Sequence, residues 1–277
     1  MRNNIMRLYK YIYVCFFLLP FSLMACVTVV DTPDECVNNS SGINPFFKTE
    51  EYSKCGTLPS PPLLNEFDKA VLDVCGDWGS TPGVEDFKNI LNEEKYKEYV
   101  DELYQKLDHQ VFTPNADLET FKNELAELWF NRDGFTHIMC GQPKLGRLGG
   151  MHFFGRYLQA QENKWVGRYY DDDLTDEVSD KVFTIGVMFK NVNGQLVVDP
   201  RKGYDFLHAN EIILHATSAY KGLSQNSQLA EQRNRHCLYG NEDVTYVFVA
   251  RKNSIVTFFA DLTPNCRRGE TECSCIK

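Results

Sequence analysis

The sequence predicts an α+β fold, in which a helical N-terminal half precedes a half of β-hairpins, small antiparallel sheets and helices. Two observations support this class. Between residues 63 and 129, apolar side chains recur at three- and four-residue spacing, as on one face of a helix. Beyond Gly134, short β-branched and aromatic runs alternate with turns and further helical segments. No repeat of solenoid length interrupts this order.

The first 25 residues predict a signal peptide. Basic residues at positions 2, 7 and 10 precede an apolar run over residues 11–25, which is short for a permanent membrane span. A retained membrane anchor is the alternative. The run ends in Leu-Met-Ala-Cys at residues 23–26, which resembles the lipobox of bacterial lipoproteins. We therefore expect a secreted, periplasmic or extracellular protein, either free or attached to a membrane only through a lipid on Cys26.

Residues 26–62 are rich in Pro, Ser, Asn and Thr and predict a tether that contains disulfides. Beyond the signal and Cys26, the chain has an even set of eight cysteines, which fits disulfide pairing in an oxidising compartment. A zinc site is the alternative, but no close cysteine pair faces a second one. The connectivity stays open among Cys36, Cys55, Cys75, Cys140, Cys237, Cys266, Cys273 and Cys275.

A helical lobe is expected over residues 63–131. Apolar residues at helical spacing predict helices over residues 64–75, 84–107 and 117–129. The last helix stops at Asn-Arg-Asp-Gly, residues 131–134, which is a suitable C-terminal cap.

A second lobe, over residues 132–277, is expected to mix helices with hairpins. Gly149 and Gly150 open a helix over residues 151–161, and a further helix follows at 209–221. Asn-Gly at 193–194 and Lys-Asn at 252–253 supply hairpin turns. Strand-like runs cover residues 182–189, 195–198, 245–250 and 255–259.

The formal net charge of −9 excludes a protein that binds nucleic acid over its whole surface. A local basic strip is still present: residues 132–168 carry six basic residues, Arg147, Arg156 and Arg168 among them, against two acidic ones. Arg201 and Lys202 extend this strip, which suits a cleft that grips an RNA backbone. A solvated face is the alternative. The acidic run at 171–173 is expected to be an exposed turn rather than a metal site, and any metal ligands stay unknown.

Two histidines beside glycine-rich stretches, His137 and His152, fit RNA cleavage by internal transesterification. One neutral imidazole takes the proton of the ribose 2'-OH, while a protonated one donates to the departing 5'-oxygen. Gly149 and Gly150 would let the backbone approach a phosphate. Ordinary loop or capping histidines are the alternative. The remaining histidines, His208, His215 and His236, lack a glycine loop, and His215 is expected to be a packed or capping residue.

The string from His137 to Gln159 resembles the catalytic segment of the EndoU family, which includes animal poly(U)-specific endoribonucleases, coronavirus uridylate-specific endoribonucleases and bacterial toxin domains. Its Gly-Arg-Leu-Gly-Gly-Met-His stretch, residues 146–152, is especially similar to the viral branch. The order of elements agrees over about residues 63–262, and the motif agrees closely over residues 134–160.

This resemblance implies a catalytic triad of His137 as general acid, His152 as general base and a downstream lysine. Lys202 fits best, because residues 200–203 read as a loop before a helix; Lys190 is the runner-up. A base-stacking tyrosine of the family corresponds to Phe259, which keeps an aromatic ring but lacks the hydroxyl.

The expected activity is cleavage of single-stranded RNA 3' of uridine to a 2',3'-cyclic phosphate, with Arg147, Gly149, Gly150 and Phe259 in substrate binding. DNA lacks the attacking hydroxyl and should not react. No cofactor is needed for this chemistry, although the resemblance admits Mn²⁺ and also suggests an inhibitor or immunity protein. The alternatives are a non-catalytic RNA-binding module and a metal-dependent hydrolase with the two histidines as ligands.

Overall fold

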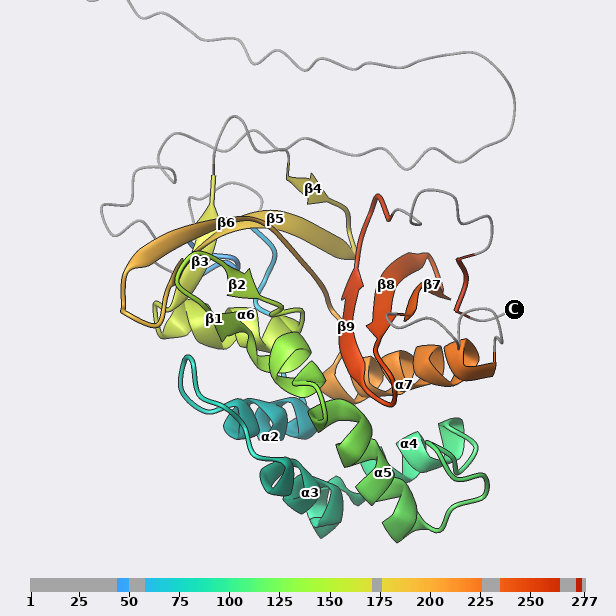
Figure 1. The fold of residues 1–277 in the computed structure, drawn as a ribbon. Helices are drawn as coiled ribbons and strands as arrows, with labels where there is room; N and C mark the ends of the chain where they lie inside the picture. Colours follow the sequence, from blue (N-terminus) through green and yellow to red (C-terminus); the bar gives the residue numbers. More distant parts are fainter. Residues whose placement is uncertain (1–43, 50–57, 171–175, 226–234, 265–272, 276–277) are drawn as a thin grey trace, which may run out of the picture.

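The computed structural model describes residues 44–49, 58–170, 176–225, 235–264 and 273–275. It confirms the α+β class: a helical lobe precedes a two-stranded hairpin and two larger antiparallel sheets, and each of the larger sheets is covered by a helix (Figure 1). The expected signal peptide, Cys26, most of the expected tether and the acidic run at 171–173 lie outside the described residues. In the part of the chain that is described, no helix is long and apolar enough to cross a membrane.

The helical lobe consists of α2 (Glu66–Cys75), α3 (Val84–Asn92), the short 3₁₀ turn η1 (Glu94–Tyr96), α4 (Lys97–Lys106) and α5 (Leu118–Phe130). Side-chain caps begin two of these helices. The Asn65 side chain accepts a hydrogen bond from the Asp68 amide, and Asp68 accepts one from the Asn65 amide. Asp117 caps α5 by accepting from the Thr120 amide. These caps satisfy amides that have no partner within the helix.

The single helix expected over residues 84–107 is wrong, because the chain turns at Glu93 and continues as η1 and α4. Glu93 has an extended backbone, with φ −75° and ψ 130°. The turn lets α3 pack against α5 and α4 pack against α7 (Ala209–Gln225). Neither glycine nor proline marks this break in the sequence, so tertiary packing decides it.

In the first sheet, β5 (Val182–Lys190) is the central strand. It pairs with β6 (Leu196–Asp205) on one edge, and with β3 (Val166–Tyr169) and β4 (Glu177–Val178) on the other. The strand expected at 195–198 is therefore much longer, and residues 200–203 belong to it rather than to a loop. A β-bulge places Pro200, which cannot donate to the ladder, between Asp199 and Lys202 in the register.

The second sheet is a meander of β7 (Arg235–Asn241), β8 (Val244–Ala250) and β9 (Ile255–Ala260), with α7 packed against it. The strands and turns expected for β8 and β9 are confirmed. β7 and β3 were not expected, because neither alternates apolar and polar residues clearly. The disulfide Cys237–Cys275 fastens the C-terminal end of the chain to β7.

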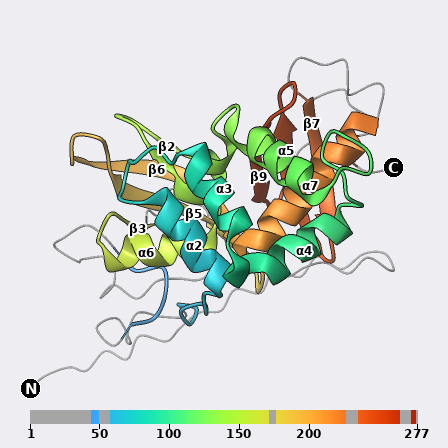
Figure 2. The same ribbon diagram turned by 90° about the horizontal axis from the view of Figure 1, so that it is seen from below.

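The two lobes meet at the N-termini of α2 and α7. The buried Asp68 carboxylate accepts hydrogen bonds from the Ala209 amide at 2.7 Å and from His208 Nδ1 at 2.6 Å. Viewed from below, α2 lies beside α6 (Phe154–Glu162) and α4 lies beside α7 (Figure 2). On α7, His215 is half-buried and shares a hydrogen bond with the Tyr239 hydroxyl, so it is packed as expected.

Residues 44–49 also contribute to the core, although they precede the expected start of the folded domain. Phe46 and Phe47 are fully buried, and their amides donate to the Gln161 side chain on α6. Asn44 forms a β-bridge with Arg168 on β3. The folded body therefore includes this segment.

Candidate active site

A cleft of about 410 Å³ opens between the two sheets. Its walls come from β6, β9 and the β-hairpin formed by β1 (Gln142–Pro143) and β2 (Leu148–Gly149). All seven residues that the sequence nominated for the site line this cleft: His137, Arg147, Gly149, Gly150, His152, Lys202 and Phe259. Lys190 does not; it ends β5, where its backbone bonds with Trp165 and Trp78.

The two imidazoles face one another across the cleft, with ring centroids 5.7 Å apart and planes inclined by 55°. His137 belongs to η2 (Thr136–Cys140), a single π-helical turn, and such turns are frequent at functional sites. His152 precedes the helix, because α6 begins only at Phe154. The helix expected to start at Met151 is thus shorter than predicted, and His152 precedes it.

Backbone hydrogen bonds fix the two histidines relative to each other. The Met151 amide donates to the His137 carbonyl at 2.7 Å, and the His152 amide donates to the Ile138 carbonyl at 2.8 Å. Gly150 lies so close to the backbone of His137 that a Cβ at this position would be 1.7 Å from the His137 carbonyl oxygen. Its φ of 65° also favours glycine. The glycine thus serves the packing of the two catalytic segments.

The hydrogen bond of His152 determines its tautomer. His152 Nδ1 lies 2.8 Å from the carbonyl oxygen of Gly203 on β6, and a carbonyl can only accept, so Nδ1 carries the proton. The neutral ring then has its lone pair on Nε2. His137 Nδ1 lies 3.2 Å from the side-chain oxygen of Gln142 on β1, which likewise leaves its Nε2 for a substrate.

Burial lowers the pKa of both rings and so favours their neutral forms in the free protein. It lowers the pKa of His152 to about 3, with the adjacent His137 ring contributing in the same direction. Burial also lowers the pKa of His137 from its ordinary 6.5, and nearby Lys202, Lys144 and Arg147 add to this effect. His152 is therefore the stronger candidate for a base that is unprotonated at working pH.

Lys202 reaches the cleft from the bulged part of β6. Its Nζ lies 3.0 Å from Asp199 Oδ2, and the same oxygen accepts the amide of Leu148 at 3.0 Å. Asp199 therefore connects the lysine to the strand that leads into the glycine loop. The β-bulge at Pro200 lies between Asp199 and Lys202. A loop was expected at 200–203, so this bulge was not predicted.

Phe259 on β9 stacks on the His152 ring, with centroids 4.9 Å apart and planes inclined by 20°. One of its faces therefore supports the imidazole. Thr257 lies two residues earlier on the same face of the strand and also lines the cleft. Within the described residues its buried hydroxyl has no hydrogen-bond partner.

The basic strip is narrower than the sequence indicated. Arg156 is 1% exposed, and its guanidinium lies beside the stacked rings of Trp78 and Trp165, 5.7 and 5.2 Å from their centroids. Arg168 is mostly buried and pairs with Asp176 on the opposite side of β5 from β6. Both of them are structural, and their inclusion in an RNA-binding strip is wrong. Long side chains with a charged end do not reveal their direction in a linear sequence.

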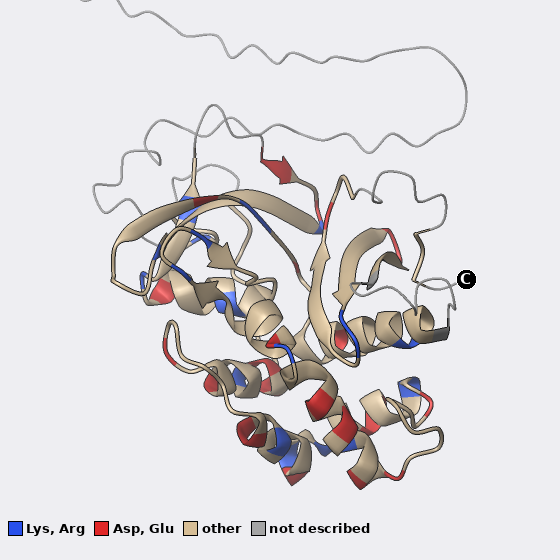
Figure 3. Ribbon diagram, viewed as in Figure 1, with Lys and Arg blue, Asp and Glu red and all other residues tan. Residues whose placement is uncertain are grey.

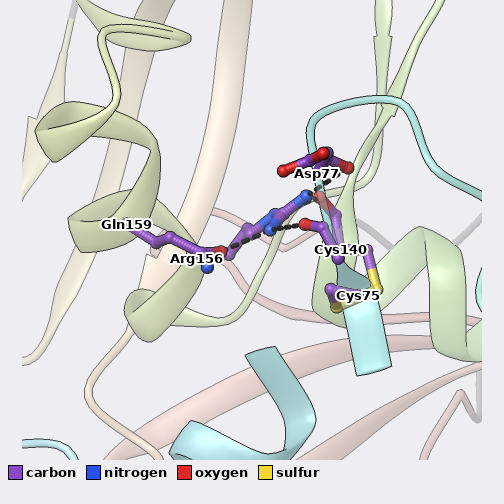
Figure 4. Close-up of a disulfide and its surroundings, with 6 residues drawn as sticks. Cys75, Asp77, Cys140, Arg156 and Gln159 are labelled. Carbon is purple, nitrogen blue, oxygen red and sulfur yellow. Dashed lines mark hydrogen bonds between the residues drawn. A yellow bond between two sulfur atoms is a disulfide. The ribbon is translucent and has the colours of Figure 1, made fainter. Parts of the chain in front are cut away.

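Arg156 instead braces the disulfide Cys75–Cys140, which joins the end of α2 to the end of η2 (Figure 4). Its guanidinium donates to the Cys140 carbonyl at 3.0 Å and to the Gly76 carbonyl at 2.9 Å. The π-helical turn that carries His137 is thus held covalently and by a buried cation. Of the expected disulfides, this bridge and Cys237–Cys275 are confirmed, and Cys273 is also disulfide-bonded.

Three contributors to the site carry no signal that stands out in the sequence: Gln142, Asp199 and the Gly203 carbonyl. Asp199 and the Gly203 carbonyl act on residues 51 positions away, and Gln142 acts on His137 across the end of the π-helical turn. Across the described ranges, no three His, Cys, Asp or Glu side chains lie close enough to hold a metal ion. His137 and His152 therefore have no third protein ligand in this part of the chain.

Comparison with known proteins gives a match over the second lobe. Residues 131–262 match the family model described as Bacterial EndoU nuclease. Among solved structures, the chain is similar to XendoU, described as a splicing-independent snoRNA-processing endoribonuclease. The TM-score is 0.46 and the identity 16%, over 71% of this chain and 76% of that one. No curated protein matches the chain.

Proposed function

We propose that the chain is an endoribonuclease of the EndoU type, which the match of residues 131–262 to that family model supports, and that it cleaves single-stranded RNA 3' of uridine through His137, His152 and Lys202. The observation that carries the proposed site is the pair of imidazoles in one cleft, 5.7 Å apart, beside a lysine.

In the proposed reaction His152 Nε2 removes the proton of the ribose 2'-OH, whose oxygen attacks the adjacent phosphorus. The bond from phosphorus to the 5'-oxygen breaks, and protonated His137 donates its Nε2 proton to that oxygen. The products are a 2',3'-cyclic phosphate and a free 5'-hydroxyl. Lys202 stabilises the negative charge that increases on the phosphoryl oxygens in the transition state. His152 gains the proton of the 2'-OH and His137 loses the one given to the 5'-oxygen, so the two imidazoles exchange protonation states during cleavage.

Uridine preference is the finer part of the proposal, and the family resemblance is its main support. The stacking face of a uracil would lie against the ring of Phe259. The unpaired hydroxyl of Thr257 is then placed to exchange a hydrogen bond with the uracil edge. Oligonucleotides with one ribonucleotide in a deoxy chain test this directly. Cleavage at uridine should exceed cleavage at the other three bases, and equal rates at all four would remove base selection from the proposal.

The chemistry is tested by incubating the mature protein with an end-labelled single-stranded RNA, with and without a chelator. We expect products ending in 2',3'-cyclic phosphate, and losses of about 10²- to 10⁴-fold for His137→Ala and for His152→Ala. His215→Gln, outside the cleft, is the matched control. Activity abolished by the chelator would favour a metal-dependent hydrolase, and intact RNA throughout would favour a non-catalytic module.

We also propose that the enzyme is exported, with a signal peptide over residues 1–25 and a disulfide-containing segment over 26–62 before a nuclease domain over 63–277. Residues 44–49 add to the core of that domain. Disulfides in the described residues agree with an oxidising compartment. Mass spectrometry of the mature N-terminus distinguishes a free protein, a lipid on Cys26 and an uncleaved signal, and the last of these would contradict export by cleavage.

A further inference from the structure

The two ends of the cleft differ in their side chains. Phe259 and the Gly203 carbonyl surround His152 at one end. At the other end, Gln142 bonds His137, and β1 leads directly from Gln142 into the turn of the β1–β2 hairpin. That turn carries Lys144 and Arg147, which both line the cleft. The proposed reaction treats the 5' side and the 3' side of the cleaved bond differently. The difference between the two ends of the cleft therefore indicates in which direction an RNA strand binds.

Lys144 and Arg147 also differ from the other basic residues around the cleft. Lys202 pairs with Asp199, and Arg201 pairs with Glu177 and Asp261. Lys144 and Arg147 are exposed, and neither forms an ion pair with any residue that the structure describes. Cations without a carboxylate partner can neutralise a backbone phosphate, which releases the counterions condensed on the RNA and favours binding.

The hairpin turn holds these two side chains in place. The Lys144 amide donates to the Arg147 carbonyl at 3.0 Å, which closes the turn. From the neighbouring β5–β6 turn, the Asn191 side chain donates to the Leu145 carbonyl at 3.1 Å. Both cations are thus presented on a braced loop beside His137, which reduces the entropy lost when they bind a strand.

The chemistry assigns a direction to the strand. A general acid must lie beside the departing 5'-oxygen, which belongs to the nucleotide 3' of the cleaved bond, and a general base must lie beside the attacking 2'-OH on the 5' side. His137 as acid and His152 as base therefore place the 3' continuation of the RNA towards the β1–β2 hairpin. The 5' nucleotide then lies towards Phe259.

We propose that Lys144 and Arg147 form a subsite for the backbone phosphates on the 3' side of the cleaved bond. This inference rests on the proposed function, because it uses the assignment of acid and base. It predicts that kcat/KM rises more when phosphates are added 3' of the cleavage position than when they are added 5' of it. The subsite reads the backbone and carries no base preference.

The test uses substrates with a single uridine ribonucleotide, extended by deoxynucleotides on either side in turn. In the wild-type protein, kcat/KM should rise with the first few 3' phosphates. In Lys144→Gln/Arg147→Gln that gain should fall about tenfold, while the gain from 5' phosphates is retained. The dependence of log kcat/KM on log salt concentration should also weaken by about 1.4, since each phosphate contact on a single strand contributes about 0.7.

The charge-matched control is Lys97→Gln/Lys106→Gln on α4, which removes two exposed lysines of the helical lobe. It should keep the 3' gain and the salt dependence of the wild type. Loss of the 5' gain instead of the 3' gain in the hairpin variant would reverse the strand direction and contradict the acid and base roles on which it rests. Unchanged gains would remove the subsite alone; either result overturns the inference while cleavage itself still stands. No cleavage of any substrate by the wild-type protein would overturn the proposed function itself.

Discussion

His137 and His152 are the same residue type, but their surroundings suit His152 to accept a proton and His137 to donate one. His152 is held by the Gly203 carbonyl, covered by Phe259 and kept neutral by burial. His137 bonds to a neutral amide side chain and faces the basic hairpin. A bound phosphate would raise the pKa of His137, because its negative charge favours the imidazolium. In the proposed reaction the substrate would thus assist the protonation of the general acid.

The pH profile should follow from these shifts. His152 is neutral above a pH of about 3, and His137, whose pKa is lowered from 6.5, must be protonated to act. We therefore expect kcat/KM to have its maximum below pH 6.5 and to fall as pH rises through the pKa of His137. The decline of kcat should occur at higher pH, since bound phosphate raises that pKa. Rates measured from pH 4 to 8 test this profile. A kcat/KM that still increases above pH 7 would contradict the assignment of His137 as acid and His152 as base.

Gly150 is the residue most sensitive to a single added methyl group. In Gly150→Ala the new Cβ would meet the His137 carbonyl, so the backbone that carries one of the two histidines must move. We expect kcat/KM to fall by roughly 100-fold or more, because displacement of a catalytic group by about 1 Å has costs of that order. Gly240→Ala is the control: it lies in open space on β7, without a positive φ. Equal activities for the two variants would show that the close approach is not needed.

At this scale the sequence predicts some contributors to the cleft better than others. The motif around His137 and His152 names the imidazoles and the glycines, and Lys202 follows from its place in the chain order. Asp199 and Gln142 could not be predicted, because an acidic or amide side chain acquires its role only from the partner that folding brings to it. Arg156 was assigned to the RNA surface because its charge was visible in the sequence and its burial was not.

The expected bounds of several helices and strands were wrong, and the packing of those elements explains why. Helix α6 starts three residues later than expected because the backbone of Met151 and His152 bonds to η2 instead of to the next turn. A π-helical turn has no residue pattern of its own, so η2 could not be foreseen. Strand β6 continues through Pro200 because the bulge leaves that position without a ladder partner. Each difference lies beside the cleft, where tertiary hydrogen bonds override local preference.

The Cys75–Cys140 bridge should matter more for catalysis than its effect on stability suggests. Its loop spans 65 residues and that of Cys237–Cys275 spans 38, so chain entropy predicts a loss of about 4 kcal/mol for removing either. Only the first holds the segment that carries His137. We expect Cys75→Ser/Cys140→Ser to lower both the urea midpoint and kcat/KM. Cys237→Ser/Cys275→Ser should lower mainly the midpoint. Equal kcat/KM values in conditions where both variants stay folded would refute this difference.

Across the whole molecule, charge separates the two lobes. Acidic residues mark α3 and α5 of the helical lobe (Figure 3), where Glu124 and Glu127 line a hollow. The unpaired cations of the cleft lie on the β1–β2 hairpin of the other lobe. A strand of RNA is repelled by the first surface and attracted by the second, so an acidic protein still binds RNA in one place. The net charge alone did not reveal this distribution.

The lobes depend on one buried carboxylate at their junction. Asp68 is 0% exposed and accepts from amides at the starts of both α2 and α7, and from His208. Asp68→Ala leaves the buried Ala209 amide and the partly buried donors of Asn65 and His208 without this acceptor, so we expect the free energy of unfolding to fall by about 3 kcal/mol. Asp73→Ala, exposed on the same helix, should change it by less than about 0.5 kcal/mol. Urea unfolding followed by circular dichroism measures both, and similar midpoints would show that the junction does not depend on Asp68.

The contact of Arg156 with Trp78 and Trp165 also has an optical consequence. The chain has three tryptophans, and these two have stacked rings 6.0 Å apart with the guanidinium beside them. Indole emission is sensitive to a neighbouring cation and to water, so two of the three indoles report on the place where the loop after α2 meets α6 and β3. Loss of this contact changes the emission without any attached dye. The two tryptophans therefore report on the region next to the disulfide that holds the helical turn of His137.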